Sequence, residues 1–535
     1  MNAMKATSST PWWRGAAIYQ IYPRSFQDSN GDGVGDLAGI TSRLDYVAEL
    51  GVDAIWISPF YTSPMRDFGY DIADYRAVDP IFGTLADFDA LIARAHALGL
   101  KVIIDQVYAH SSDLHPWFAE SRSARVGPRA DWYVWANSKR DGTPPNNWQS
   151  VFGGPAWTWD ARRGQYYMHT FLKEQPQLNV HNLAVQDALL DVARFWLERG
   201  VDGFRLDALN HSMHDPRLRN NPPAPDDGKP RSRPFDFQLR LHSQSQPGVI
   251  PFIERIRALC DHYGAIHTVA EVGGDNAQTE IAAYTRGEKR LNSAYGFDFL
   301  YATELTPAVI AEVLAAWEGD GKRAGWPSWA FENHDAPRAV SRWCAPDQAD
   351  SFARVKMALL LALRGNVILY QGEELGLRQD HIPFEQLQDP EAIANWPLTL
   401  GRDGARTPMP WLSDRQFGGF TTGHPWLPLS PQNLALSVAA QKADSASLLH
   451  LTQHLLALRR DNAALRIGGI ENVCADEALL CFDRVAGRQR LRCVFNLSTD
   501  ARKPPAMPPH CTLIASVNAA SLASMPGYSA LYLDL

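Results

Sequence analysis

Three stretches of this chain repeat one pattern, in which an amphipathic helical segment, a glycine and an apolar strand follow one another. Gly51, Gly99 and Gly200 each end a helical segment and precede an apolar run whose last residues are polar. Glycine commonly ends a helix because it adopts the left-handed backbone conformation without strain. Helices that lead into almost continuous apolar strands are typical of buried parallel sheets. The repetition predicts an α/β fold, and we favour a (β/α)8 TIM barrel over a doubly wound open sheet.

The distances between these glycines are unequal and indicate an insertion. Gly99 lies 48 residues after Gly51, whereas Gly200 lies 101 residues after Gly99. The second interval is therefore roughly fifty residues longer than one strand and helix require. We predict an inserted subdomain after the third strand, which ends near Val107, and its many Gly, Pro, Asn and Trp residues favour loops and short strands.

Further strands are predicted where short apolar runs end in polar residues, at residues 267–272, 329–335 and 366–372. After a helical stretch at residues 448–460, apolar residues alternate with period two, which predicts a C-terminal antiparallel β domain. The predicted division is residues 1–107 and 181–465 for the barrel, residues 108–180 for the inserted subdomain, and residues 466–535 for the C-terminal domain.

Composition and charge exclude some partners. The chain has 51 Lys and Arg residues against 59 Asp and Glu residues, a net charge of -8, without a long block of one sign. Because nucleic-acid binding needs a basic surface, we expect no nucleic-acid partner. The chain has no apolar run as long as a signal peptide or a spanning helix requires, which predicts a cytoplasmic protein without a membrane partner. The spacing of Cys474, Cys481, Cys493 and Cys511 matches no zinc motif and favours reduced thiols.

The predicted strand ValAspGlyPheArgLeuAspAla, at residues 201–208, carries the first candidate catalytic residue. Arg205 and Asp207 lie two residues apart and so share a face, with Asp207 where the strand meets its loop. An arginine there would hold the carboxylate ionised, as a nucleophile requires, although a structural ion pair is an equally good interpretation. Glu271 and Asp335 end two later predicted strands. Three carboxylates at one end of a barrel repel one another, so we interpret them as functional and as suited to glycosyl transfer.

These residues belong to motifs that resemble the α-amylase superfamily, glycoside hydrolase family 13. The four main motifs occur in the family's order: AspGlnValTyrAlaHis at 105–110, GlyPheArgLeuAsp at 203–207, GluValGlyGly at 271–274 and PheGluAsnHisAsp at 331–335. Further similar segments are at residues 51–59, 175–179 and 370–374, so that the resemblance covers essentially the whole chain.

The resemblance implies a role for each of these side chains. Asp207 corresponds to the nucleophile, Glu271 to the general acid and base, and Asp335 to the third carboxylate, which binds sugar hydroxyls. His110 and His334 correspond to residues that hydrogen-bond the sugar at the cleaved bond. Such an enzyme cleaves the glycosidic bond in two displacements and retains the configuration at the anomeric carbon.

Two segments, at residues 69–75 and 401–411, resemble the α-glucosidase and oligo-1,6-glucosidase branch of this family. In that branch an Asp and an Arg close the pocket around a terminal glucose, and we assign these roles to Asp71 and Arg402. Ala208, which follows the nucleophile, favours α-1,4 linkages. We therefore expect an exo-acting α-glucosidase that acts on small α-glucosides such as maltose and transfers glucose to sugar or alcohol acceptors. An oligo-1,6-glucosidase or a sucrose-acting isomerase or hydrolase is the alternative.

Two phenylalanines in the predicted insertion have two possible roles. Phe152 and Phe171 are candidates to stack on the sugar ring, because aromatic faces suit the apolar faces of sugars. They are equally good candidates for the core of the inserted subdomain. The sequence alone leaves both interpretations open.

An acidic loop near the N-terminus predicts a bound calcium ion. Its oxygen-bearing residues alternate and Gly33 lies at the sharp turn, as in known calcium loops. We interpret the ion as structural Ca²⁺, for which Mg²⁺ is a substitute, and a metal-free acidic loop is the alternative. The predicted ligands are Asp28, Asn30, Asp32, the carbonyl group of Val34, and Asp36.

Overall fold

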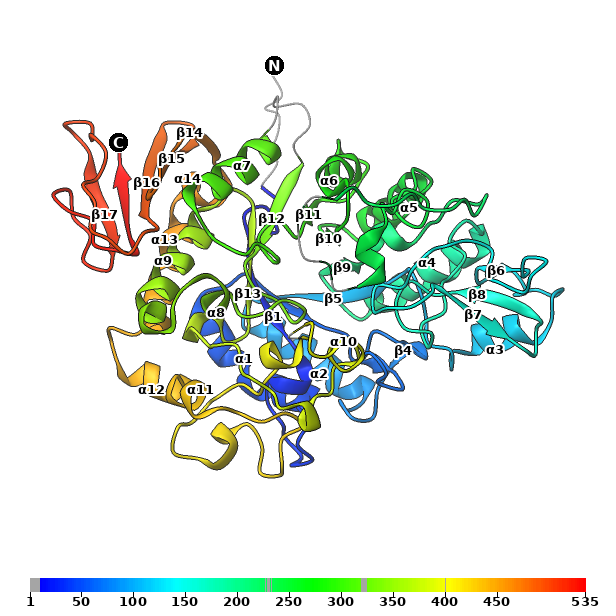
Figure 1. Ribbon diagram of the computed structural model, residues 1–535. Coiled ribbons are helices and arrows are strands. Elements are labelled where there is room, and N and C mark those ends of the chain that lie inside the picture. The colour runs from blue at the N-terminus through cyan, green and yellow to red at the C-terminus, as the bar shows by residue number, and fades with distance from the viewer. Residues whose placement is uncertain (1–9, 227, 229–230, 232, 319–324, 400) are drawn as a thin grey trace, which may run out of the picture.

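The computed structural model describes residues 10–226, 228, 231, 233–318, 325–399 and 401–535. Within this part of the chain, eight parallel strands close into a barrel in the order β1-β13-β12-β11-β10-β9-β5-β2 (Figure 1). The predicted TIM barrel is therefore confirmed. The barrel strands are β1 (Ala17–Ile21), β2 (Ala54–Ile57), β5 (Lys101–Val107), β9 (Gly203–Asp207), β10 (His267–Glu271), β11 (Ser293–Tyr295), β12 (Trp326–Ala330) and β13 (Asn366–Tyr370).

Helices follow the barrel strands and cover the outside of the barrel (Figure 1). The main ones are α1 (Leu37–Leu50), α2 (Leu85–Ala97), α4 (Leu183–Glu198), α5 (Val249–His262), α6 (Ala277–Thr285), α7 (Pro307–Glu318), α9 (Ala349–Ala362) and α13 (Leu448–Asp461). Shorter helices are α3 (Pro116–Ser123), α8 (Ala339–Trp343), α10 (Pro390–Asn395), α11 (Pro431–Ala435), α12 (Val438–Ala443) and α14 (Ala463–Ile467). In the described ranges, none of these helices has the length and apolar character that crossing a bilayer requires.

The first helix shows how the sequence sets these boundaries. The Asp36 side chain accepts a hydrogen bond from the Gly39 amide and so caps the N-terminus of α1. Gly51 ends the helix with a φ of 91°, in the left-handed region that glycine adopts without strain. Capping residues and the stopping glycine are local signals, and for this reason the pattern in the sequence predicts α1 correctly.

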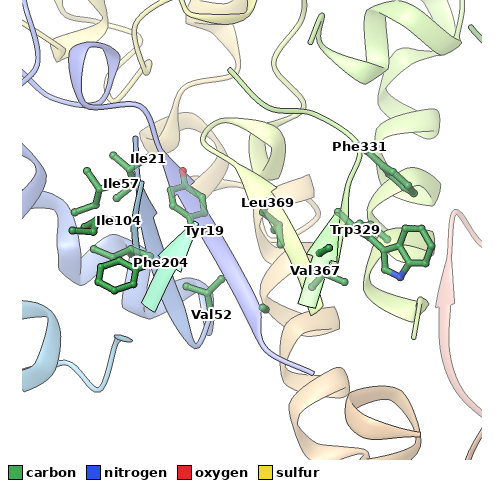
Figure 2. Close-up of a cluster of buried hydrophobic side chains, with 14 of the residues drawn as sticks. Tyr19, Ile21, Val52, Ile57, Ile104, Phe204, Trp329, Phe331, Val367 and Leu369 are labelled. Carbon is green, nitrogen blue, oxygen red and sulfur yellow. The ribbon is translucent and has the colours of Figure 1, made fainter. Parts of the chain in front are cut away.

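The outward-facing side chains of the barrel strands form the main core together with the helices. Figure 2 shows part of this cluster, in which Ile57, Ile104 and Phe204 from three neighbouring strands lie together. Tyr19 and Leu369 extend the cluster across β1 and β13. Burial of aliphatic and aromatic area on this scale is the main source of stability for such a fold.

A three-stranded and a five-stranded sheet lie on opposite sides of the barrel in Figure 1. After β5, the chain forms a three-stranded antiparallel sheet of β6 (Trp135–Ala136), β8 (Gln165–Met168) and β7 (Trp157–Asp160). A separate two-stranded antiparallel sheet, before β5 in the chain, joins β3 (Tyr61–Thr62) to β4 (Asp74–Val78). At the C-terminus, a five-stranded sheet has the order β14-β15-β16-β18-β17. Its strands are β14 (Gly469–Ala475), β15 (Leu479–Ala486), β16 (Gln489–Asn496), β17 (Thr512–Val517) and β18 (Ser529–Asp534).

One predicted strand is out of register with the structure. The sequence predicts a strand at residues 329–335, whereas β12 spans Trp326–Ala330, so that Asp335 lies on the following loop. The side chain of Asn333 causes the chain to turn there, because it accepts hydrogen bonds from the amides of Asp335 and Ala336. The prediction that Asp335 ends a strand is therefore wrong, although its place at the carboxyl end of the barrel is correct.

Candidate active site

A cavity of about 560 Å³ opens at the carboxyl ends of the barrel strands. Asp207, Glu271 and Asp335 all line this cavity, as the sequence analysis expected. Asp207 is the last residue of β9 and Glu271 is the last residue of β10, and these two strands are neighbours in the barrel. The strand order therefore places two of the carboxyl groups side by side, while Asp335 comes from the loop after β12.

Arg205 connects three carboxyl groups at the bottom of the cavity. Its Nη1 atom lies 2.7 Å from Oδ1 of Asp207 and also forms an ion pair with Asp105, and its Nη2 atom lies 2.7 Å from Oε2 of Glu271. Trp56 donates a further hydrogen bond to Asp105, at 2.8 Å. We call Arg205, Asp105, Asp207 and Glu271 the cavity cluster. Asp207 and Glu271 bind separate arms of one guanidinium group, which fixes them next to each other.

The cavity cluster has more negative than positive charge. Burial raises the pKa of Asp207 well above its usual range, and Glu271 and Asp105 raise it further, against the opposing effect of Arg205. Burial also raises the pKa of Asp105 to about 6, although Arg205 lowers it. Arg205 forms the expected ion pair with Asp207 and lowers its pKa, against burial and the other two carboxyl groups; that Asp207 is ionised stays a prediction. Three buried carboxyl groups around one guanidinium group therefore raise one another's proton affinity.

The backbone after Asp207 has a conformation that is rare for an alanine. Ala208 has φ 39° and ψ 42°, in the left-handed region, and its amide donates a hydrogen bond of 3.2 Å to Oε2 of Glu271. Tyr295 donates a second hydrogen bond, at 3.1 Å, to Oε1 of Glu271. Both contacts orient the Glu271 carboxyl group. Strain of this kind is retained where the surrounding structure needs the geometry.

Asp335 has its own set of basic partners. Arg406 lies 2.7 Å and Arg402 lies 3.4 Å from Oδ1, and Nε2 of His334 lies 3.2 Å from Oδ2. Burial by itself would raise the pKa of Asp335, but His334, Arg406 and Arg402 together hold that pKa below its usual range. Asp335 is therefore ionised at neutral pH, whereas burial shifts the pKa of Asp207 in the opposite direction.

The loop that carries Asp335 is held from behind by buried ion pairs. Lys356 of α9 lies 2.7 Å from a carboxylate oxygen of Glu332 and 2.7 Å from one of Glu373. Arg338 lies 3.2 Å from the other oxygen of Glu332. We call these four residues the anchoring cluster. Because Glu332 and Arg338 lie on either side of Asp335 in the chain, the anchoring cluster fixes both ends of its loop.

The acidic partner of Arg402 is Asp67, and the assignment of this role to Asp71 is wrong. Nη2 of Arg402 lies 2.9 Å from Oδ1 of Asp67 and 2.7 Å from Oδ1 of Asp389. Asp67 and Arg402 both line the cavity. The carboxylate of Asp71 points away into the turn, where it accepts hydrogen bonds from the Ser63 hydroxyl and from the amides of residues 66 and 67. Two aspartates only four residues apart made the sequence ambiguous.

His110 lines the cavity, whereas His334 is completely buried in contact with Asp335 and Tyr70, which line it. The Gln20 side chain contacts Nδ1 of His334 at 2.8 Å, and the Tyr70 hydroxyl lies 2.6 Å from Nε2. Gln175 lies 3.1 Å from Nε2 of His110, which lines the cavity. Burial lowers the pKa of His334 to about 3 and that of His110 to about 4. Both rings therefore serve as hydrogen-bonding groups without charge.

Phe152 and Phe171 lie on the cavity wall. Their ring centroids are 5.8 Å apart, and the guanidinium group of Arg402 lies 5.0 Å from the centre of the Phe152 ring. Phe171 also contacts His110, with ring centroids 5.2 Å apart. Of the two interpretations that the sequence left open, this position favours contact with the sugar over a place in the core of the insertion.

Several residues of the site did not follow from the sequence. Asp67, Tyr70, Asp105, Asp389 and Arg406 contact the predicted residues directly. Asp105 opens the first family-like motif, Tyr70 lies in the segment at residues 69–75, and Arg406 lies in the segment at residues 401–411. Reading every polar residue of these segments would have found these three, whereas Asp67 lies two residues before the segment at residues 69–75. Nothing local in the sequence marks Asp389 as a partner of Arg402.

The predicted calcium loop contains suitable oxygen atoms, but its side chains do not converge on one point. Among the described residues there is no group of three or more His, Cys, Asp or Glu side chains placed to hold a metal ion. Asp28 accepts hydrogen bonds from the amides of Asn30, Gly31 and Gly33, and Asp36 accepts one from Ser29. Hard carboxylate and carbonyl oxygens suit calcium chemically. The calcium site stays a prediction.

The barrel and its cavity of paired carboxyl groups define a glycoside hydrolase. The chain belongs to the alpha-amylase family, because the family model described as "Alpha amylase, catalytic domain" matches residues 20–468. This places most of the described barrel, together with the insertion, inside the family's catalytic domain.

Curated relatives and solved structures narrow the comparison. The chain is 53% identical over 497 residues to a probable alpha-glucosidase of Rhizobium meliloti (strain 1021), which covers 92% of this chain and 90% of that protein. It is 36% identical to an oligo-1,6-glucosidase of Parageobacillus thermoglucosidasius, over 91% of this chain and 90% of that protein. The crystal structure of the alpha-glucosyl transfer enzyme XgtA has a TM-score of 0.94 at 49% identity and covers 98% of this chain and 100% of that chain. The trehalulose synthase MutB from Pseudomonas mesoacidophila MX-45 has a TM-score of 0.89 at 30% identity, with the same coverage.

Proposed function

We propose that the protein is an exo-acting, retaining α-glucosidase that releases terminal glucose from short α-glucosides, with a preference for α-1,4 linkages. The observation that carries the proposal is the cavity in which Asp207, Glu271 and Asp335 meet beside the Asp67–Arg402 ion pair. The similarity to a probable alpha-glucosidase at 53% identity supports the same class of substrate.

In the first step, a carboxylate oxygen of Asp207 attacks the anomeric carbon of the terminal glucose. Glu271 acts as the general acid and gives a proton to the glycosidic oxygen as the bond to the leaving group breaks. The hydrogen bonds from Tyr295 and the Ala208 amide orient Glu271 for this transfer. The product of the step is a glucosyl ester of Asp207.

In the second step, the ionised Glu271 takes a proton from water or from an acceptor hydroxyl group. The oxygen then attacks the anomeric carbon, and the ester bond to Asp207 breaks. Asp335, held ionised by Arg406 and Arg402, accepts hydrogen bonds from sugar hydroxyls, and these bonds strengthen as charge develops on the ring. Two inversions leave the configuration unchanged.

The charged end of the cavity explains why we propose attack at chain ends. Arg402 is fully engaged with Asp67, Asp389 and Asp335, and its side chain is 8% exposed. A buried ion pair of this kind forms a closed wall, because separating the charges would leave them unpaired in a low dielectric. The wall leaves room for a terminal glucose and blocks a chain that continues past it.

The reaction products test the proposed linkage preference and the transfer of glucose to acceptors. With p-nitrophenyl α-glucoside, whose only sugar is the transferred glucose, we expect α-glucose as the first anomer released, seen by proton NMR. With concentrated maltose we expect trisaccharides. Comparing the rates of hydrolysis of maltose, isomaltose and sucrose distinguishes the α-1,4 proposal from the oligo-1,6-glucosidase and sucrose-isomerising alternatives. The similarity to an oligo-1,6-glucosidase and to a trehalulose synthase is the reason to test both alternatives. The Asp207→Asn protein, prepared identically, controls for contaminating glucosidases. Release of β-glucose first would contradict the mechanism, and isomaltose turned over faster than maltose would contradict the linkage.

We also propose that the loop containing Asp28, Asp32 and Asp36 binds calcium as a structural ion, with Mg²⁺ as a weaker substitute. Binding to the folded state alone raises its stability by mass action. We therefore expect calcium to raise the melting temperature of chelator-treated protein, and we expect Asp32→Ala to remove this increase. The proposal would be contradicted if calcium left the melting temperature of the wild-type chain unchanged and a calorimetric titration detected no heat of binding.

A further inference from the structure

We propose that Cys474 and Cys481 form a redox-reactive pair that is oxidised to a cross-strand disulfide by a peroxide. The two residues lie on β14 and β15 of the C-terminal sheet and are direct partners in the antiparallel register. Both are free thiols in the structure. The sequence analysis expected reduced thiols in this region, and the strand register places two of them opposite each other.

The register satisfies the geometry of a disulfide. Residues directly opposite each other in an antiparallel pair have Cα atoms about 4.5 or 5.5 Å apart, depending on the hydrogen-bonding position. Disulfides join residues whose Cα atoms are about 4.4 to 6.8 Å apart, so either position falls in this range. Opposed residues also project their side chains to the same face of the sheet. The pair can therefore close without a change of the backbone path.

The other cysteines of the sheet are less well placed. Cys493 of β16 is opposite Phe482, whereas Cys481 is opposite Val494, so that Cys481 and Cys493 project to opposite faces. Cys493 is also completely buried. Cys511 packs against the same small apolar cluster as Cys481 but lies on the loop before β17 and is in no strand register with it. Cys493 is thus a matched control, and Cys511 is the competing partner to be tested.

The two thiols differ in exposure, which sets the order of reaction. Cys474 is exposed, whereas Cys481 is half-buried. Burial raises the pKa of Cys481 to about 11, although Arg492 lowers it. Thiolates are the reactive form, so the exposed Cys474, which the peroxide reaches more easily, is oxidised first.

The chemistry balances with a peroxide as oxidant. The thiolate of Cys474 attacks one peroxide oxygen, the O–O bond breaks, and a sulfenic acid and water result once the departing oxygen has taken up protons. The Cys481 sulfur then attacks the sulfenic sulfur, its proton is taken up with the departing hydroxide as a second water, and the S–S bond forms. Two thiols lose two electrons and two protons, and one peroxide is reduced to two waters.

The test is mass spectrometry of the full-length protein after brief treatment with hydrogen peroxide. We expect a mass lower by two hydrogen atoms, a fall from six alkylated cysteines to four under non-reducing conditions, and one cross-linked peptide that contains Cys474 and Cys481. A thiol reductant reverses all three changes. Cys474→Ser and Cys481→Ser each prevent the cross-link, whereas Cys493→Ser and Cys511→Ser leave it unchanged.

Three outcomes would overturn the proposal. Cys474 could accumulate as sulfinic acid while Cys481 remains free, the cross-link could join Cys481 to Cys511, or all six thiols could survive the treatment. Because the C-terminal sheet contributes no residue to the cavity, we expect the oxidised protein to keep its glucosidase rate within about twofold. Failure of the glucosidase proposal leaves this mass measurement unaffected.

Discussion

The cavity cluster and the anchoring cluster are both buried, yet their charges are balanced differently. In the cavity cluster, three carboxyl groups share the one cation Arg205. In the anchoring cluster, Glu332 and Glu373 are matched by Lys356 and Arg338. A buried charge is costly unless it is paired, so the balanced charges of the anchoring cluster are consistent with a structural role. The excess of carboxyl groups around Arg205 destabilises the fold. We attribute it to catalysis, because a nucleophile and a general acid must lie side by side.

The comparison predicts that removing an acid from the cavity cluster destroys activity without harming the fold. Asp207→Asn removes the nucleophile, and we expect kcat to fall by a factor of about a thousand or more. The loss of one of three mutually repelling carboxyl groups leaves the melting temperature unchanged or higher. Assays with a chromogenic α-glucoside and calorimetry measure both quantities. An active variant, or an inactive variant that is also unfolded, would break the comparison.

Removing a charge from the anchoring cluster is expected to act on stability instead. Lys356→Met leaves Glu332 and Glu373 buried without their shared cation, which costs about 3 to 5 kcal/mol of unfolding free energy. Lys442→Met breaks an exposed ion pair with Glu49 and serves as the control, with an expected change below about 1 kcal/mol. Denaturant titration compares the two variants. Equal effects at both positions would show that the anchoring cluster is not structural.

A third pair of variants separates Asp67 from Asp71. Asp67→Asn weakens the wall formed with Arg402, so we expect kcat/KM for maltose to fall by about a hundredfold, mainly through KM. Asp71→Asn replaces an acceptor of three hydrogen bonds in the turn and costs about 1 to 3 kcal/mol of stability. The reverse pattern, with kinetic loss only for Asp71→Asn, would restore the assignment made from the sequence.

The smallest predicted effect is a pH dependence inside the anchoring cluster. Burial and Glu332 raise the pKa of Glu373 to about 7 against the effect of Lys356, so the folded protein binds a proton there that the unfolded chain releases near pH 4.5. This contribution to stability is complete below pH 4.5 and is lost as the pH rises through 7. Relative to Glu373→Gln, which does not titrate, wild-type stability should fall by about 1.5 kcal/mol between pH 5.5 and 7. A constant difference in urea titrations at the two pH values would contradict this pKa.

Two barrel strands escaped the sequence analysis for physical reasons. β11 is only three residues long, SerAlaTyr, and so carries no readable apolar pattern. β1 lies before Gly51 and is not preceded by the helical segment and glycine that predicted β2, β5 and β9. In contrast, the strands predicted at residues 201–208 and 267–272 match β9 and β10 to within two residues at each end, because each is a largely apolar run with a charged side chain near its end. Both carboxyl groups of the proposed acid and nucleophile pair were therefore found from the sequence.

The sequence by itself determined the barrel and the carboxyl groups at its strand ends, because helix stops and buried strands are encoded by neighbouring residues. Only the tertiary structure decided how the charges pair. Arg402 meets Asp67 across 335 positions of the chain, and Arg205 meets Asp105 across 100. Such contacts depend on where long loops cross above the barrel, and a single sequence contains no local signal for that distance.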